Sequence, residues 1–302
     1  MINAHTQLVG LLGWPVAHSL SPAMHNAAFD ALGLNWRYVP LPVHPSRVEE
    51  AVRGLAALGF RGANVTVPHK QAVIPALDSL DVTAQVLGAV NTLLVERQAD
   101  GSTAIRGYNT DAPGFAGALR VGGFEPGGGQ DCLVVGAGGA ARAVVLGLLQ
   151  SGLAKIVVLN RTLERAQALV AHLGWANLAY PPRLSVLPLT QDALVESARA
   201  AGLLVNATQV GMWPHVDASI WPEAVPLPAH LSVYDLVYNP LETRLLRQAR
   251  AAGANAIDGL GMLVGQGAVA FEMWTGQGPA ERVAALMRAA CERALATLNL
   301  KS

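Results

Sequence analysis

The sequence has few cysteines and no excess of basic residues, so neither a disulfide framework nor binding to nucleic acid is indicated. Its 302 residues include two cysteines, Cys132 and Cys291, which are too few for a framework of disulfides. Cys132 lies in a hydrophobic run, where we expect a small core residue. Charged residues make up only 14% of the chain, and 21 basic residues balance 21 acidic ones. A nucleic-acid partner is therefore not expected.

Long hydrophobic runs are missing as well. The longest, residues 143–154, includes Gln150 and stops before Lys155, well short of the roughly 20 residues that a membrane span needs. The first residues, MINAHTQLVGLLGW, have neither the basic start nor the cleavage pattern of a signal peptide. These absences lead us to expect a cytoplasmic protein with no membrane partner.

Apolar residues make up 52% of the chain, and the length is sufficient for two domains with separate cores. In the first hundred-odd residues, strand-like runs alternate with helical ones, which predicts an α/β layer with a largely parallel sheet. We expect strands at 8–13, 36–43, 62–68 and 91–97. Helices are expected at 22–32, at 45–58, and from the end of the third strand to about residue 80.

The texture changes near residue 121, where the glycine-rich stretch VGGFEPGGGQD leads into a buried strand, CLVVG. Further strands are expected at 155–160, 184–189, 203–208 and 232–238, with helices between them, so a second α/β unit begins here. The proline-rich stretch 213–229 is expected to be loop, and the chain after NAID is expected to be helical to its end. From these patterns alone, the docking site of the last helices stays open.

A strand, a turn and a helix are predicted around Gly136-x-Gly138-x-x-Ala141. Gly136 suits a tight turn, Gly138 allows the backbone to approach a pyrophosphate, and Ala141 allows close packing of helix on strand. Because a second strand follows about 20 residues later, this pattern predicts a dinucleotide site. A glycine turn without a ligand is the alternative.

The end of that second strand bears on which dinucleotide is bound. An NAD site usually has Asp or Glu there, to accept a hydrogen bond from the ribose 2′-hydroxyl. This sequence has Asn160, followed by Arg161 and Thr162, with Arg165 one helical turn further on. A neutral amide beside two guanidinium groups favours the 2′-phosphate of NADP. The alternative is a pair of solvated arginines at a helix start.

Polar residues also follow strands in the first half of the chain. Ser21 is a good N-cap, Pro22 suits the first helical turn, and Ser19 lies two residues before the cap, so both hydroxyls could meet an anion at a helix N-terminus. Lys70 follows the strand GANVTVP, although a solvated lysine is the alternative. Asp111 could simply cap the next helix.

These segments together resemble one enzyme family, the shikimate dehydrogenases. The matching motifs, in chain order, are HSLSPAMHN, NVTVPHK, GAVNT, GYNTD, GAGGAARA, NRT, NATQVGM, DLVYNPLET and DGLGMLVGQGA. Gln209 departs from the commoner NATS form of its motif. The resemblance implies an α/β fold of two domains. Residues 1–112 and 259–302 would form the substrate-binding and catalytic domain, with the C-terminal helices packed back on it, and residues 113–258 a doubly wound NADP-binding Rossmann domain.

The resemblance also implies roles for individual residues. Lys70 and Asp111 become the catalytic pair, and no metal ligand is implied. The substrate-binding residues are Ser19, Ser21, Thr66, Lys70, Asn91, Asp111, Tyr238 and Gln266. The cofactor-binding residues are Gly136, Ala137, Gly138, Gly139, Ala140, Asn160, Arg161, Thr162, Arg165, Asn206, Ala207, Thr208, Leu236, Gly259 and Met262.

The implied reaction is the reversible reduction of 3-dehydroshikimate by NADPH to shikimate, in chorismate and aromatic amino-acid biosynthesis. Its partners are then small molecules, and the protein is expected to be a monomer or a homodimer. One alternative is a quinate/shikimate dehydrogenase that uses NAD. Another, from a different class, is a nucleotide-sensing regulator that kept the fold and lost catalysis; the presence of both Lys70 and Asp111 argues against it.

Overall fold

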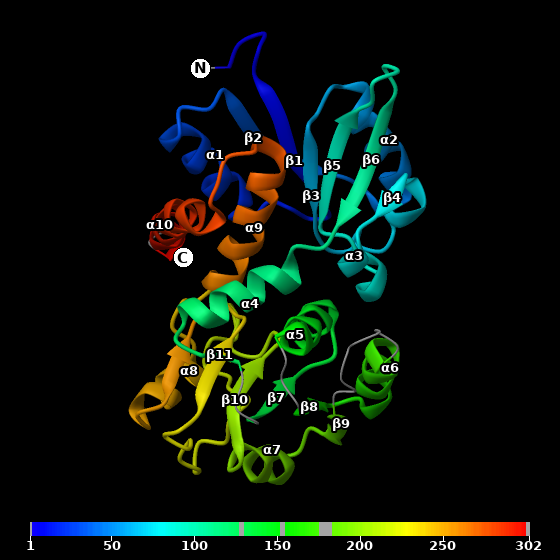
Figure 1. Ribbon diagram of the computed structural model, residues 1–302. Coiled ribbons are helices and arrows are strands. Elements are labelled where there is room, and N and C mark those ends of the chain that lie inside the picture. The colour runs from blue at the N-terminus through cyan, green and yellow to red at the C-terminus, as the bar shows by residue number, and fades with distance from the viewer. Residues whose placement is uncertain (1, 127–129, 152–154, 175–182, 300–302) are drawn as a thin grey trace. The chain divides into compact units, whose positions relative to one another are not determined.

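The computed structural model describes residues 2–126, 130–151, 155–174 and 183–299. The chain divides into two compact units, which Figure 1 shows in ribbon form. Unit 1 comprises residues 1–110 and 264–302, and unit 2 comprises residues 111–263. The second crossing between the units falls within helix α9 (Leu260–Thr275), a few residues after the start of the last segment expected from the sequence.

Unit 1 is built on a six-stranded sheet with the strand order β2-β1-β3-β5-β6-β4. The strands are β1 (Gln7–Gly13), β2 (Trp36–Pro42), β3 (Gly62–Val65), β4 (Ser79–Leu80), β5 (Thr92–Arg97) and β6 (Thr103–Tyr108). The pairs β3–β5 and β5–β6 are antiparallel, whereas β1–β2, β1–β3 and β4–β6 are parallel. Three of these five pairs are parallel, as expected, and the two antiparallel pairs arise because β5 and β6 form a hairpin rather than a crossover unit.

Helices cover both faces of this sheet (Figure 1). They are α1 (Ser21–Ala31), α2 (Val48–Ala57, preceded by the 3₁₀ turn Pro45–Arg47), α3 (Val82–Leu87), the part of α9 from Val264 onward, and α10 (Ala280–Asn299). One face buries an aliphatic core against α2, with Val52 and Leu93 fully buried. On the other face, α10 packs on α1, and the indole Nε1–H of Trp274 in α9 donates to Leu93 O at 2.9 Å. The C-terminal helices thus complete the first unit, as expected.

Residues 69–80 do not form the predicted helix. They contain turns, the 3₁₀ segment Ile74–Ala76 and the short strand β4. Pro75 accounts for the difference, because a proline inside a helix removes one hydrogen-bond donor and clashes with the preceding turn. The strand expected over 62–68 also ends early, at Val65.

Unit 2 is a fully parallel six-stranded sheet with the order β12-β11-β10-β7-β8-β9. The strands are β7 (Asp131–Val135), β8 (Lys155–Asn160), β9 (Arg183–Pro188), β10 (Ala201–Asn206), β11 (Ser232–Asp235) and β12 (Asn255–Ile257). The chain runs outward from β7 in one direction and from β10 in the other. This is the doubly wound arrangement, in which ligands bind outside the carboxyl ends of the strands where the order reverses.

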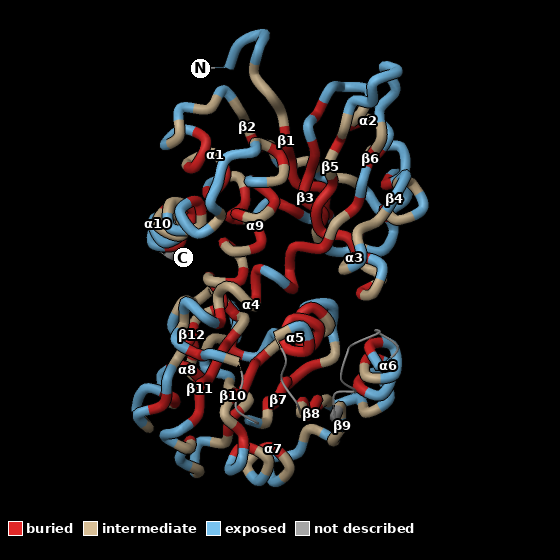
Figure 2. Tube along the Cα trace, viewed as in Figure 1, coloured by how far each residue is buried: buried red, intermediate tan, exposed pale blue. Residues whose placement is uncertain are grey.

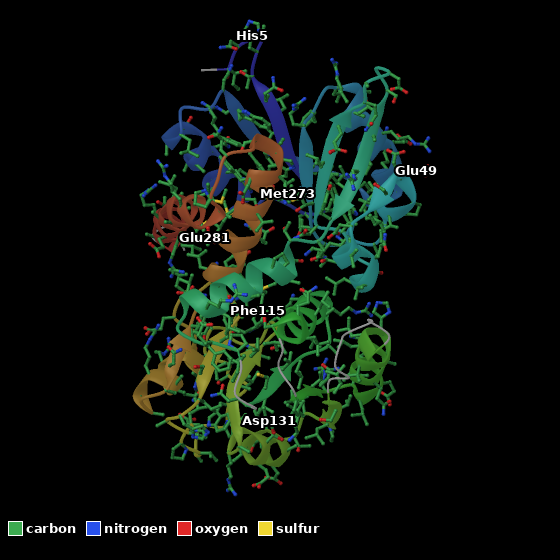
Figure 3. All side chains as sticks on the ribbon, viewed as in Figure 1. His5, Glu49, Phe115, Asp131, Met273 and Glu281 are labelled. Atoms are coloured by element: carbon green, nitrogen blue, oxygen red, sulfur yellow. The ribbon has the colours of Figure 1, made fainter. Side chains whose placement is uncertain are left out.

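The helices of unit 2 are α4 (Asp111–Val121), α5 (Gly139–Gln150), α6 (Leu163–Gly174), α7 (Gln191–Ala198) and α8 (Arg244–Ala251). Figure 2 shows that β11 and most of β7 and β10 are buried. Phe115 of α4, labelled in Figure 3, stacks on Tyr234 of β11 with ring centroids 5.2 Å apart. Cys132 is fully buried in β7, and burial raises the pKa of its thiol to about 12, so it is the core residue expected from the sequence.

Within the described ranges, no helix combines the length and apolarity needed to cross a membrane.

Candidate substrate and cofactor sites

The serine pair lies at the start of α1, but the capping arrangement differs from the prediction. Leu20 occupies the cap position, and Ser21 is the first helical residue. The Ser21 N–H donates to Ser19 Oγ at 3.2 Å, so Ser19 satisfies this backbone group. Ser21 is only 6% exposed. Burial raises the pKa of Tyr38 far above its usual value, and a hydrogen bond between Tyr38 and Ser21 lowers this pKa in part. The prediction that Ser21 caps the helix was wrong, because its hydroxyl lies beside Tyr38, which is 17 positions further along the chain.

A chain of buried polar side chains runs behind the serines. The Tyr38 hydroxyl donates to Asn64 Oδ1 at 2.9 Å. Asn64 Nδ2 donates in turn to Thr92 Oγ1 at 3.1 Å and to Asn91 O at 3.2 Å. Tyr38, Thr92 and Asn91 are each at most 2% exposed, so this chain links the middle of β2 to the start of β5 inside the unit.

Asn91 is held in one orientation by its neighbours. Its Oδ1 accepts from Thr110 N at 2.8 Å, and its Nδ2 donates to Thr110 Oγ1 at 3.0 Å. The same Nδ2 lies 3.5 Å from Gln266 Oε1 on α9. Both amide groups are buried. Asn91 and Gln266, which are 175 positions apart in the chain, therefore lie side by side.

Thr66, which directly follows β3, lies against the end of β1. Its N–H donates to Leu12 O at 2.8 Å. A Cβ atom added to Gly13 would lie 2.3 Å from Thr66 Cγ2, so a glycine is needed here for the two segments to approach so closely.

Lys70 is half-buried, and the backbone connects it to the same group. Its carbonyl accepts from Val90 N at 2.8 Å, and Val90 precedes Asn91. Asn91 is bonded to Thr110, which immediately precedes Asp111. Asp111 is the first residue of α4 and is 9% exposed. Lys70 belongs to unit 1 and Asp111 to unit 2.

In unit 2, the glycine turn has the geometry that its sequence predicts. Gly136 has a φ of +116°, which residues with a side chain rarely adopt. A Cβ atom there would lie 2.9 Å from Ala207 O. Gly138 is the N-cap of α5, and a Cβ on Gly138 or Gly139 would meet no atom within 4 Å. The start of α5 is thus open to a ligand, and its free N–H groups favour an anion.

The residues expected to select the nucleotide follow β8. Asn160 Nδ2 donates to Thr162 O at 2.7 Å, which closes the turn before α6. Arg161, Thr162 and Arg165 are exposed. Two exposed guanidinium groups beside a neutral amide at the end of the second strand suit a 2′-phosphate better than a bare ribose.

The other predicted cofactor residues gather at the ends of neighbouring strands. Ala207 N donates to Val135 O at 2.8 Å, next to Gly136, and Leu236 N donates to Asn206 O at 3.0 Å. A Cβ on Gly259 would lie 2.3 Å from Leu236 O, so Gly259 packs directly on that backbone. Met262, near the start of α9, and Tyr238, after β11, also belong to unit 2.

Asp235 is a functional candidate that the sequence reasoning missed. It is fully buried at the end of β11, and burial raises the pKa of its carboxyl to about 6. It accepts from Asn206 Nδ2 at 2.9 Å and from Thr243 Oγ1 at 2.6 Å. Asn206 Oδ1 in turn accepts from Thr208 Oγ1 at 2.6 Å, so the carboxyl supports the loop after β10. Its place in the DLVYN motif, directly after an apolar run, was the available signal.

A dinucleotide-binding unit of this type, joined to a unit with a buried polar cluster, defines the class of two-domain, nicotinamide-dependent oxidoreductases. Three family models match the chain: the shikimate dehydrogenase substrate binding domain over residues 11–93, shikimate / quinate 5-dehydrogenase over 124–217, and the shikimate 5′-dehydrogenase C-terminal domain over 259–292.

Curated relatives and solved structures match over most of the chain. The shikimate dehydrogenase (NADP(+)) of Moorella thermoacetica is 48% identical over 91% of this chain and 90% of its own. That of Rubrobacter xylanophilus is 49% identical over 92% and 94%. The crystal structure of shikimate 5-dehydrogenase from Thermus thermophilus with NADP(H) and shikimate has a TM-score of 0.79 and 43% identity, covering 96% of this chain and 100% of that one. The chain belongs to the shikimate dehydrogenase family, which confirms the predicted resemblance.

Proposed function

We propose that this protein catalyses the reversible, NADPH-dependent reduction of 3-dehydroshikimate to shikimate. The observation that carries the proposal is the match to relatives named shikimate dehydrogenase (NADP(+)), 48% and 49% identical over nine-tenths of the chain. The cofactor is NADP. Two features favour it over NAD: Arg161 and Arg165 are exposed, and position 160 is a neutral asparagine rather than an aspartate or glutamate.

The substrate is a cyclic acid with several hydroxyl groups, and the polar residues of unit 1 suit both features. Ser19 and Ser21 would bind the carboxylate, with Tyr238 as a third partner. Thr66, Asn91 and Gln266 would form hydrogen bonds with the ring hydroxyls or with the carboxylate of the bound acid. The two buried hydrogen bonds between Thr110 and Asn91 support this assignment, because they fix the Asn91 amide before substrate arrives.

The cofactor residues fall into two groups along the carboxyl ends of the unit 2 strands. The backbone of Gly136, Ala137, Gly138, Gly139 and Ala140 would hold the pyrophosphate, while Asn160, Arg161, Thr162 and Arg165 would hold the adenosine 2′-phosphate. Asn206, Ala207, Thr208, Leu236, Gly259 and Met262 would line the nicotinamide side. When bound, NADPH supplies the hydride.

Besides the hydride, the reduction needs one proton, which a group of the protein has to donate to the substrate. Negative charge develops on the substrate oxygen during reduction, and the ammonium group of Lys70 would stabilise that charge and donate a proton to the oxygen. Asp111 would hold the Lys70 side chain in place and accept a hydrogen bond from a ring hydroxyl.

The reaction places the protein in chorismate and aromatic amino-acid biosynthesis. We propose that it acts in the cytoplasm, as a monomer or a homodimer, on small-molecule partners only.

A steady-state assay tests the proposal by crossing two substrates, shikimate and quinate, with two cofactors, NADP⁺ and NAD⁺. The expected result is the highest kcat/KM with shikimate and NADP⁺. Turnover of quinate with NAD⁺ alone would overturn the choice of substrate and cofactor. No turnover with any pair, in a folded protein that still binds NADPH, would favour the nucleotide-sensing alternative.

A further inference from the structure

In the loop that carries Lys70, an apolar side chain is exposed and a polar one is buried, which is the reverse of the usual distribution. Val67 is 70% exposed, whereas His69 is 1% exposed. Burying an imidazole while leaving a valine in water costs free energy unless the imidazole makes a compensating hydrogen bond. The sequence reasoning left His69 without a role, so its burial needs an explanation.

The side chain of His69 makes one such bond, to the end of a neighbouring strand. Its Nε2 lies 2.7 Å from Val43 O. Because a carbonyl oxygen can only accept, Nε2 must carry a hydrogen and act as the donor. Nδ1 is buried and makes no hydrogen bond among the described residues.

The backbone of Val43 is held in place by the end of a neighbouring strand. Its N–H donates to Gly13 O at 3.0 Å, at the end of β1 and next to the close contact between Gly13 and Thr66. The His69 N–H also donates to Thr66 O at 2.9 Å. His69 therefore connects the loop to the same strand ends that position Thr66.

We propose that His69 is a positioning residue, which fixes the backbone from which Lys70 projects by donating from Nε2 to Val43. The inference rests on the proposed role of Lys70. A lysine side chain has four flexible methylene groups, so its ammonium can be placed only if its backbone is fixed. The His69 side chain holds this backbone on one side, and the hydrogen bond from Val90 N to Lys70 O holds it on the other.

A double-mutant cycle separates positioning from general structural support. Phenylalanine in place of His69 keeps a planar ring of similar size but removes the donor. We expect His69→Phe to lower kcat by about 10–100-fold, since small misplacements of catalytic groups cost that much, with little change in the KM for NADP. In a Lys70→Ala background, the same change should alter kcat by less than about 2-fold, because no ammonium remains to be misplaced.

Two further variants test the donor itself. Glutamine places its amide nitrogen near the position of Nε2, whereas asparagine is too short to reach Val43. We expect His69→Gln to recover kcat to within about 3-fold of the parent and His69→Asn to stay low. His230→Gln, at an exposed histidine of unit 2, is the matched control and should leave kcat unchanged.

If His69→Phe lowers kcat by the same factor in both backgrounds, or if His69→Asn works as well as His69→Gln, the positioning role is wrong while that of Lys70 stands. If Lys70→Ala alone keeps nearly full kcat, the proposed function of Lys70 fails, and this inference fails with it. Should His69→Phe fail to fold, as judged by circular dichroism, the comparison of the glutamine and asparagine variants decides.

Discussion

At the scale of single residues, the buried polar groups of unit 1 are bonded mainly to one another. Tyr38, Asn64, Asn91, Thr92 and Thr110 form a connected set in which a hydroxyl or amide group nearly always has a partner. Such a set keeps its members in one orientation, because partly satisfied buried polar groups would be costly. Function here depends on how side chains are held as well as on which side chains are present.

Lys70→Ala is expected to lower kcat by about 10²–10⁴-fold, the usual contribution of a positioned acid–base group, while the KM for NADP changes little. Steady-state kinetics with shikimate and NADP⁺ provide the measurement. Lys155→Ala is the control, since Lys155 makes a partly exposed ion pair with Asp131 in unit 2 and should not affect turnover. Near-parental kcat in the Lys70 variant would remove this residue from the mechanism.

Arg161→Ala should raise the KM for NADP by roughly 10–100-fold, the effect of losing a charge-assisted hydrogen bond to phosphate. The KM for NAD, which lacks the 2′-phosphate, should change by less than about 3-fold. Arg199→Ala, at an exposed arginine of unit 2 paired with Glu196, serves as the control. An equal increase for both cofactors would contradict the assignment of the phosphate site.

The residues that the sequence analysis missed share one property. Asn64, Thr110 and Asp235 are polar, buried, and bonded to partners distant in the chain; the bond from Asn206 to Asp235, for example, spans 29 residues. A local pattern contains no information about such partners. The same limit explains Ser21, where an N-cap preference was overridden by burial beside Tyr38.

At the scale of elements, the strands of unit 2 were predictable because each central strand is buried and therefore apolar on both faces. The runs at β7, β8 and β10 have no competing interpretation in the sequence. In unit 1, the short apolar run VIPAL suits a helix by composition, and only Pro75 signals otherwise. The antiparallel arrangement of β5 and β6 depends on a hairpin turn around Gly101 (φ +85°), and a single glycine in a polar stretch does not by itself predict such a turn.

The turn between β7 and α5 is constrained both by its backbone conformation and by a close neighbour at Gly136. Gly136→Ala is expected to lower stability by about 1–3 kcal/mol, because the new Cβ faces both an unfavourable φ and the carbonyl of Ala207. The KM for NADP should rise at the same time, since the turn presents the backbone to the cofactor. Denaturant unfolding and steady-state kinetics measure the two effects.

Gly117→Ala on α4 is the matched control. A Cβ there meets no atom within 4 Å, and an alanine inside a helix is preferred by about 0.5–1 kcal/mol. The control should therefore be neutral or stabilising. If Gly136→Ala behaves in the same way, the constraint on the turn has been overestimated.

At the scale of the whole molecule, the two units contain buried titratable groups with opposite responses to acid. Burial lowers the pKa of His25 in unit 1 to about 3, below its unfolded value of 6.5, and burial raises that of Asp235 in unit 2 to about 6, above 3.8. As pH falls from 6.5 toward 3, the unfolded state takes up the His25 proton and unit 1 loses stability. As pH falls from 6 toward 3.8, the folded state takes up the Asp235 proton and unit 2 gains stability.

We therefore expect acid to weaken unit 1 first, with contributions on the order of 2–5 kcal/mol from each group. Hydrogen exchange of the β1–β2 amides should accelerate between pH 6 and 4, relative to that of the β10–β11 amides. His25→Phe, which suits the surrounding aromatic cluster, should remove the acid sensitivity of unit 1, and Asp235→Asn should remove the opposing trend in unit 2. Parallel acceleration in both units, unchanged by either substitution, would contradict this account.

Unit 2 is one uninterrupted stretch of chain, whereas unit 1 is assembled from two stretches that enclose it. The bond from Trp274 to Leu93 and the packing of α10 on α1 both join the late stretch to the early one. During synthesis on the ribosome, unit 2 has all of its residues before unit 1 does. Unit 1 therefore cannot complete its fold until residues 264–302 have been synthesised, although its first 110 residues are synthesised before any residue of unit 2.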